Sequence, residues 1–232
     1  MERIDDLQLN NLKIIQDDEK FMFGTDGVLL ARFAKVKQGA RVLDIGTGTG
    51  IANFIGYGLQ PAAHFTGIDI QEDMVEMAKR SQALNGIEGM AFFHADLKIF
   101  DGKHRFNVVT CNPPYEKQGA GEQTSNASAA IARYEIKANL DDIVACAYRA
   151  LQPAGKFYLI HRAERLTEIA RVLRENQMEL KGICPIQKDG ESAPKLLLLE
   201  AVYGGKEYLH WYPPVILYGD SRQMREYKEL GL

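Results

Sequence analysis

The chain has 232 residues, of which 46% are hydrophobic and 25% charged, a composition typical of a soluble globular protein. The formal net charge is -3 at pH 7, so the overall charge does not mark a nucleic-acid-binding or membrane-binding protein. The polar N-terminus is unlike a signal peptide, and no apolar run approaches the roughly 20 residues of a membrane helix. We therefore expect a cytoplasmic protein that does not enter a membrane.

The cysteines argue against a structural metal site. Cys111, Cys146 and Cys184 are widely spaced, odd in number and free of CxxC or Cys/His ligand spacing. This pattern predicts free thiols in a reducing compartment and no bound metal.

Short apolar runs alternate with longer segments of helical periodicity, which predicts βαβ units on a mostly parallel sheet. The expected strands span 40–46, 64–70, 90–96, 106–112 and 156–162, and the expected helices span 50–59, 71–86, 140–153 and 163–177. Two more apolar runs, 178–186 and 194–204, have no helical pattern between them. We expect them to form an antiparallel hairpin that completes the sheet.

Local signals mark where some of these elements begin and end. Thr25 is a candidate N-cap for an early helix with the apolar face VLLARFA, and Asn139 is a candidate N-cap for the helix at 140. Pro153 and Gly155 are expected to close that second helix. The segment 116–139 is polar and rich in small residues, which is typical of a functional loop or lid.

A glycine-rich run, DIGTGTG, follows the first expected strand and opens a helix. Its glycines, Gly46, Gly48 and Gly50, allow a tight turn and a close approach to a ligand at the carboxyl end of a strand. A dinucleotide-binding turn has GxGxxG, whereas this run carries Asp44 two residues before its first glycine. That carboxylate repels phosphate and suits a cationic ligand such as S-adenosylmethionine.

Two further aspartates end the next two expected strands. Asp69 in GIDI can accept hydrogen bonds from both hydroxyls of a ribose, and Ile70 can flank an adenine ring. Asp96 in HADL can accept from an adenine amino group, with the backbone amide of Leu97 beside it. Three carboxylates at successive strand ends predict a nucleoside-binding edge of the sheet.

In this order and spacing, DIGTGTG, GIDI and HADL resemble class I S-adenosylmethionine-dependent methyltransferases. The resemblance implies an α/β, Rossmann-like fold with helices on both faces of a seven-stranded, mostly parallel sheet. The implied strand order is 3-2-1-4-5-7-6, with strand 7 antiparallel. We expect a single domain over 1–232, with a core at 38–205, a tail at 206–232 and an extension at 1–37 that lies over the cofactor pocket.

The tetrapeptide Asn112-Pro113-Pro114-Tyr115 ends the fourth expected strand and offers a site for a planar amine. The side-chain carbonyl of Asn112 and the backbone carbonyl of Pro113 can accept the two N–H groups as the nitrogen becomes tetrahedral. Pro114 has no N–H and helps keep that carbonyl free, and Tyr115 can stack on the ring. The tetrapeptide resembles the (D/N)PP(Y/F) signature of amino-methyltransferases, whose substrates include adenine, guanine and glutamine amides.

The upstream stretch FMFGTDGVLL narrows the substrate. It resembles the tRNA1(Val) adenine-N6 methyltransferases, which modify the adenosine next to the anticodon, and in that group it lies over the cofactor pocket. The resemblance implies cofactor contacts from Phe23, Gly24 and Thr25, and substrate contacts from Arg133 and Lys195. It implies tRNA as the partner and N6-methyladenosine at position 37 as the product.

Three alternatives remain open from the sequence: a release-factor glutamine N5-methyltransferase, a ribosomal-RNA guanine-N2 methyltransferase, and a cofactor-binding protein without catalysis. The first usually carries a helical domain of some 70 residues before its core. Here the first core strand is expected near residue 40, which leaves no room for that domain. The second usually has Phe in place of Tyr115. Basic residues past the fifth expected strand, Arg162 and Arg165 among them, either contact RNA phosphates or form a solvated helix surface.

Overall fold

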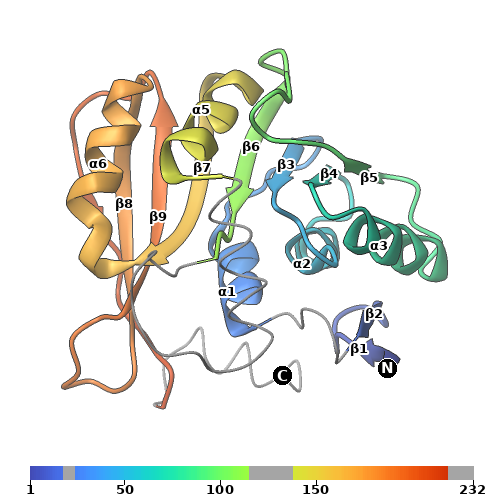
Figure 1. The fold of residues 1–232 in the computed structure, drawn as a ribbon. Coiled ribbons are helices and arrows are strands. Elements are labelled where there is room, and N and C mark those ends of the chain that lie inside the picture. The colour runs from blue at the N-terminus through green and yellow to red at the C-terminus, as the bar shows by residue number, and fades with distance from the viewer. Residues whose placement is uncertain (18–23, 115–137, 219–232) are drawn as a thin grey trace.

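The computed structural model describes residues 1–17, 24–114 and 138–218. Its centre is a large sheet (Figure 1) whose seven long strands are β3 (Arg41–Ile45), β4 (His64–Asp69), β5 (Met90–His94), β6 (Phe106–Cys111), β7 (Leu151–Arg162), β8 (Met178–Gln187) and β9 (Leu196–Tyr203). Along the sheet they run in the order β5-β4-β3-β6-β7-β9-β8. All neighbours pair in parallel except β9, which is antiparallel to both β7 and β8. The expected order 3-2-1-4-5-7-6, with its antiparallel strand 7, is confirmed.

The sheet is nevertheless larger than the seven strands that we expected. Two two-residue strands, β10 (His210–Trp211) and β11 (Val215–Ile216), pair in parallel with β8 and bring the sheet to nine strands. A separate antiparallel hairpin joins β1 (Glu2–Asp6) and β2 (Lys13–Asp17) near the N-terminus. These strands are short, so they carry too little apolar alternation to stand out in the sequence.

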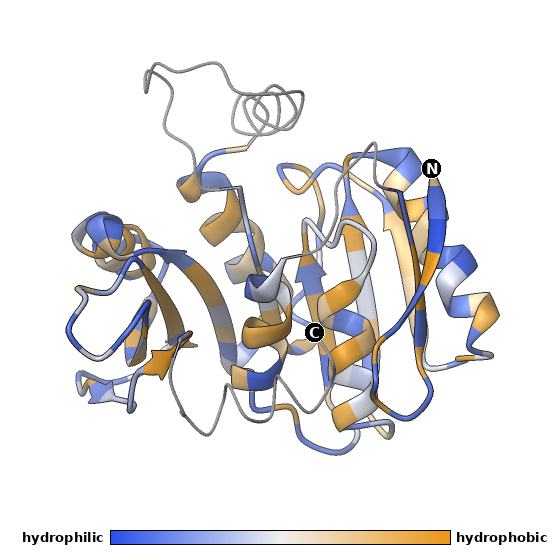
Figure 2. Cartoon of the chain, turned by 90° about the horizontal axis from the view of Figure 1, so that it is seen from below, coloured by the Kyte–Doolittle hydropathy of each residue, from blue (hydrophilic) through white to orange (hydrophobic). Residues whose placement is uncertain are grey.

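Helices cover both faces of the sheet, as expected. On one face lie α1 (Thr25–Phe33), α2 (Ile51–Leu59) and α3 (Glu72–Leu84), and on the other lie α5 (Leu140–Ala150) and α6 (Leu166–Glu175), which follows the 3-10 turn η1 (Ala163–Arg165). Figure 2 shows apolar segments along the sheet and on the helix sides beside it. The expected hydrophobic core of an α/β sheet is therefore present in two layers.

Helix ends agree with the sequence signals only in part. Asn139 caps α5 as expected, in a reciprocal capping box with Asp142. Two other expectations were wrong. Gly24, not Thr25, stands at the N-cap of α1, and Thr25 is the first helical residue. The helix α5 ends at Ala150, and Pro153 to Gly155 lie inside β7. They fall in a register shift between Leu151 and Lys156, both of which pair with β6.

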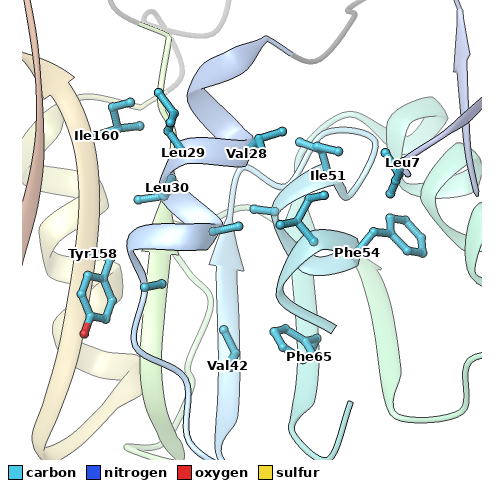
Figure 3. Close-up of a cluster of buried hydrophobic side chains, with 14 of the residues drawn as sticks. Leu7, Val28, Leu29, Leu30, Val42, Ile51, Phe54, Phe65, Tyr158 and Ile160 are labelled. Atoms are coloured by element: carbon cyan, nitrogen blue, oxygen red, sulfur yellow. The ribbon is translucent and has the colours of Figure 1, made fainter. Parts of the chain in front are cut away.

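Helix α1 joins the N-terminal part of the chain to the sheet. Figure 3 shows its side chains Val28, Leu29 and Leu30 among residues of β7 and α2, including Ile160 and Phe54. All three leucine and valine side chains of α1 are at most 2% exposed. Their burial holds the first turn of α1 close to the end of β6.

The hairpin β1–β2 packs instead on the outer side of α3. The Ile15 amide donates to Ser81 Oγ at 2.9 Å, and Arg80 forms an ion pair with Glu2 at 2.7 Å. Residues 1–17 thus lie beside α2 and α3, whereas the first turn of α1 approaches Asn112. The division of the chain at 37 and 205, and the idea that residues 1–37 cover a bound cofactor, stay predictions.

Candidate active site

The four predicted strand ends meet at one edge of the sheet, because β3, β4, β5 and β6 are parallel. A pocket that is open to solvent lies at this edge. Its lining consists of Gly46, Ile68, Asp69, Ile70, Ala95, Asp96, Leu97 and Ala138. Five residues predicted to bind the cofactor are therefore brought together around one space: Gly46, Asp69, Ile70, Asp96 and Leu97.

The glycine loop forms one wall of this pocket. Gly46, Gly48 and Gly50 all have positive φ, at 69°, 54° and 88°, a region in which residues with a side chain are strained. At Gly50 a Cβ atom would also lie 2.8 Å from the ring of Phe92. The loop needs its glycines both for the turn and for the close approach of its backbone to the packed rings below.

Asp69 is fixed beside the loop by backbone amides. Its two carboxylate oxygens accept from the Gly48 amide at 2.8 Å and from the Gln71 amide at 2.9 Å. The side chain is 3% exposed, and this burial raises the pKa of Asp69, while the backbone hydrogen bonds act in the opposite direction. The carboxylate is thus a buried and well-oriented acceptor in the lining of the pocket.

Asp44 is also buried, at 3% exposure, and lies two residues before the pocket-lining Gly46. Thr110 on the neighbouring β6 donates its hydroxyl to Asp44 Oδ1 at 2.7 Å. Burial raises the pKa of Asp44 to about 6, and hydrogen bonds from Thr110 and Thr47 limit the rise. The network continues to Asn53, which donates to Thr47 Oγ1 at 3.0 Å.

Thr110 was missed by the sequence reasoning, although one signal was available. It is a buried polar residue next to the apolar Val108, Val109 and Cys111 of β6, two positions before Asn112. Its bond to Asp44 joins the strand that precedes the glycine loop to the strand that carries the tetrapeptide. It therefore ties together the cofactor and substrate parts of the predicted site.

The segment after β5 is held in place by several polar contacts. Asp96 accepts from the Lys98 amide at 2.8 Å, and the carbonyl of Leu97 accepts from Arg149 at 2.7 Å. The carbonyl of Ile70 lies 3.1 Å from His94 Nε2. These contacts order the far wall of the pocket before any ligand is present.

Asn112 follows directly on β6 and is half-buried, between the pocket edge and α1. A Cβ atom at Gly27 of α1 would lie 3.8 Å from Asn112 Nδ2 and 2.9 Å from Ile51 Cγ2. The first turn of α1 thus approaches the amide of Asn112 closely. Pro113 is buried and Pro114 is half-buried, which fits a rigid segment at the end of a strand.

Some of the other predicted site residues lie in the described part of the chain and some do not. Gly24 and Thr25 open α1, and Lys195 is exposed directly before β9. Phe23, Tyr115 and Arg133 lie outside the described residues, so their predicted contacts stay predictions.

The described part of the chain also bears on metals, thiols and membranes. Within it, no group of three or more His, Cys, Asp or Glu side chains is arranged to hold a metal ion. Cys111, Cys146 and Cys184 are buried free thiols. None of the helices that can be described is both long enough and apolar enough to cross a bilayer.

Comparison with known proteins agrees with this arrangement. Residues 36–212 match the family described as a methyltransferase domain. A solved Agrobacterium tumefaciens protein, described as a predicted O-methyltransferase, has the same fold, with a TM-score of 0.68 and 21% identity over 85% of this chain and 90% of that one. A methyltransferase from Aquifex aeolicus superposes with a TM-score of 0.55 and 14% identity over 77% of this chain and 89% of that one.

Two curated relatives are more similar in sequence. A Vibrio parahaemolyticus protein is 32% identical over 180 residues, which are 76% of this chain and 73% of the relative. A Flavobacteriaceae bacterium protein is 28% identical over 190 residues, which are 80% of this chain and 78% of the relative. Both are named tRNA1(Val) (adenine(37)-N6)-methyltransferase. The chain has a class I methyltransferase fold, a pocket at the strand ends and Asn112-Pro113 at the end of the neighbouring β6. It belongs to the tRNA1(Val) (adenine(37)-N6)-methyltransferase family.

Proposed function

We propose that this enzyme transfers a methyl group from S-adenosylmethionine to the N6 atom of an adenosine in tRNA, at position 37 of tRNA1(Val). The observation that carries the proposal is the meeting, at one sheet edge, of the Asp69 pocket and Asn112-Pro113. Enzymes with a tetrapeptide such as Asn112-Pro113-Pro114-Tyr115 act on several planar amines. Family membership favours adenine in tRNA among these substrates.

The residues around the pocket fit S-adenosylmethionine by their chemistry. Asp69 offers a buried acceptor for the ribose hydroxyls, and Asp96 and Leu97 offer polar groups for the adenine. Asp44 supplies negative charge near a sulfonium and an ammonium, and the glycine loop lets the backbone come close. When bound, the cofactor supplies an electrophilic methyl group on a positively charged sulfur.

The chain's own part in the reaction is to orient a poor nucleophile. The lone pair of the adenine amino nitrogen is delocalised into the ring, so the nitrogen reacts only after it begins to pyramidalise. The Asn112 side-chain oxygen and the Pro113 carbonyl are proposed to accept its two N–H groups and stabilise the charge that develops there. No side chain has to remove a proton first, because the methylated ammonium is strongly acidic; in-line placement then provides most of the acceleration.

The remaining substrate contacts are proposed from the family resemblance. Tyr115 stacks on the target base, and Arg133 and Lys195 contact the RNA. A tRNA anticodon loop is largely single-stranded, which lowers the few kcal/mol needed to turn a base out into a pocket. We place the enzyme in the cytoplasm, where unmodified tRNA is found, and assign it no metal.

The nucleosides of tRNA from cells with and without the gene test this proposal. We expect N6-methyladenosine to disappear from the tRNA1(Val) of cells that lack the gene and to return when the gene is restored. An unchanged amount of N6-methyladenosine in tRNA would contradict the substrate, even if the purified protein bound the methyl donor.

A further inference from the structure

The basic residues at the end of β7 and beyond it include two groups that differ in their partners. Three arginines of η1 and α6 are neutralised locally: Arg165 pairs with Glu168 at 2.7 Å, Arg171 with Glu175 at 2.6 Å, and Arg174 with Glu179 at 2.9 Å. Arg162 and Lys195 are exposed, and neither forms an ion pair with any described residue. Arg162 and Lys195 therefore both offer positive charge at this end of the sheet.

Arg162 lies on the same face of the sheet as Asn112. Cys111 pairs with Leu159 across β6 and β7, so the register puts Asn112 beside Ile160. Arg162 follows Ile160 by two residues on β7, so its side chain leaves the sheet on the same face as Ile160 and Asn112. It lies closer to the end of the strand than Ile160 does. Neighbouring strands lie about 4.8 Å apart, and two residues advance a strand by about 6.6 Å. The Cα atoms of Asn112 and Arg162 are therefore separated by roughly 8 Å.

The backbone around Arg162 is well anchored. His161 is buried at 2% exposure, and its Nδ1 accepts from the Arg162 amide at 2.8 Å. Burial lowers the pKa of His161 to about 4, so the ring is neutral at pH 7 and adds no charge of its own. Arg162 also pairs with Leu196 of β9, which fixes the end of the strand.

Lys195 is held next to this strand end. Its carbonyl accepts from the Ala163 amide at 3.0 Å, and its own amide donates to the Ile186 carbonyl at 3.2 Å. Since Ala163 is the neighbour of Arg162, the two exposed cations leave the chain from adjacent points, one at the end of β7 and one directly before β9. Arg162 pairs with Leu196, so Lys195 starts from the opposite face of the same sheet edge. Their separation from Asn112 is set by strand pairing and not by a free loop.

We propose that Arg162 and Lys195 bind the RNA phosphates that flank the target adenosine. This rests on the proposed function. A nucleotide whose base is turned into the site carries its phosphates with it, so they must pass the mouth of the pocket. The two exposed cations, one of them a strand away from Asn112, lie where those phosphates pass, whereas Arg165, Arg171 and Arg174 already hold carboxylates.

The salt dependence of tRNA binding tests this assignment. Arg162→Ala and Lys195→Ala are compared with the wild type over about 50 to 200 mM salt, using unmodified tRNA1(Val) transcript. Each substitution is expected to weaken binding and to reduce the slope of log K against log salt by roughly 0.7–0.9, the value for one phosphate contact. Arg162→Lys should keep most of the wild-type slope of log K against log salt, because lysine keeps the positive charge.

Arg171→Ala is the matched control, since it also removes an exposed arginine, but one that is paired with Glu175. It should leave the slope unchanged, and every variant should bind S-adenosylmethionine as the wild type does, which shows that the fold is intact. Equal slopes for the wild type and Arg162→Ala would overturn the phosphate assignment. A wild-type protein that does not methylate the transcript would instead contradict the proposed function, so the two failures are distinguishable.

Discussion

The two halves of the ligand edge are built in opposite ways. At the ends of β3, β4 and β5 the polar groups are carboxylates, and the buried Asp44 and Asp69 already accept hydrogen bonds from Thr110 and from backbone amides. Next to the end of β7 and the start of β9 lie the exposed cations Arg162 and Lys195. Asn112 stands between the two halves.

This difference follows from what each half is proposed to hold. A small cationic cofactor loses most of its water on binding, so its partners must be ordered in advance, and burial of their charges must be offset by hydrogen bonds. A large polyanion keeps much of its hydration and is attracted by charges that stay in water. Mutations in the two halves should therefore separate cofactor binding from RNA binding, and mutations at Asn112 should affect neither binding step strongly.

The largest effect is expected at the boundary between the halves. Asn112→Ala removes an acceptor that acts on the developing charge, so kcat should fall roughly 10²–10³-fold, as for loss of one preorganised hydrogen-bonding group. Methyl transfer to tRNA and cofactor affinity are measured in parallel. Asn112→Asp keeps an acceptor oxygen and should retain more activity. If Asn112→Ala loses cofactor binding as strongly as methyl transfer, Asn112 is structural.

The next effect concerns the cofactor half alone. Asp69→Ala removes a charged acceptor whose hydrogen bonds are worth roughly 1.5–3 kcal/mol each, so cofactor affinity should fall by about 10- to 100-fold. Calorimetric titration with S-adenosylmethionine measures this loss. Asp101→Ala, at an exposed aspartate away from the pocket, is the control and should change nothing. An unchanged affinity in Asp69→Ala would remove the ribose contact from the proposal.

A smaller effect tests how closely α1 must approach Asn112. A Cβ atom at Gly27 would lie 2.9 Å from Ile51 Cγ2, so Gly27→Ala must displace that side chain or α1 itself. We expect a loss of about tenfold in kcat, in line with small displacements of positioned groups, and little change in cofactor affinity. Gly190→Ala, where a Cβ atom meets open space, serves as the control. Full activity in Gly27→Ala would show that Asn112 tolerates movement of α1.

The smallest effect is a change in pH dependence. Asp44 has a pKa of about 6, and its ionised form is the one that favours a cationic ligand. Cofactor affinity should therefore fall as the pH drops through about 6 and Asp44 takes up a proton. Thr110→Val removes a hydrogen bond that lowers the pKa of Asp44, so the loss of affinity should move to higher pH.

Thr110→Ser provides the control for that experiment, because it keeps the hydroxyl and should keep the wild-type profile. The other carboxylate that acts on Asp44, Asp69, is present in both variants. Cofactor affinity is measured from about pH 5 to 8, the range that spans the expected transition. Identical profiles for Thr110→Val and the wild type would show that the bond to Thr110 does not control Asp44.

The sequence predicts most of the cofactor half because its signals are local. Strand periodicity, a glycine turn and an aspartate at each strand end occupy short stretches, and parallel pairing then brings the ends together. The strand order was obtained from family resemblance, and it is confirmed. The strands β10 and β11 were missed because two-residue strands have no periodicity to detect.

The substrate half depends on contacts that a sequence does not display. Arg162 and Arg165 lie close together in the sequence, and the structure shows that Glu168 pairs with Arg165 while Arg162 stays exposed. Likewise, the bond between Thr110 and Asp44 joins residues that are 66 positions apart. Such pairings arise from register between strands and from side-chain packing, so they become visible only in the folded chain.

The central claim is that Asn112 presents an adenine of tRNA to the methyl donor at the Asp69 pocket. The most direct test is to incubate the purified enzyme with labelled S-adenosylmethionine and a tRNA1(Val) transcript and to map the labelled nucleoside. We predict N6-methyladenosine at position 37 and no labelling of a transcript with guanosine there. Label on another nucleoside, or equal labelling of both transcripts, would contradict the account.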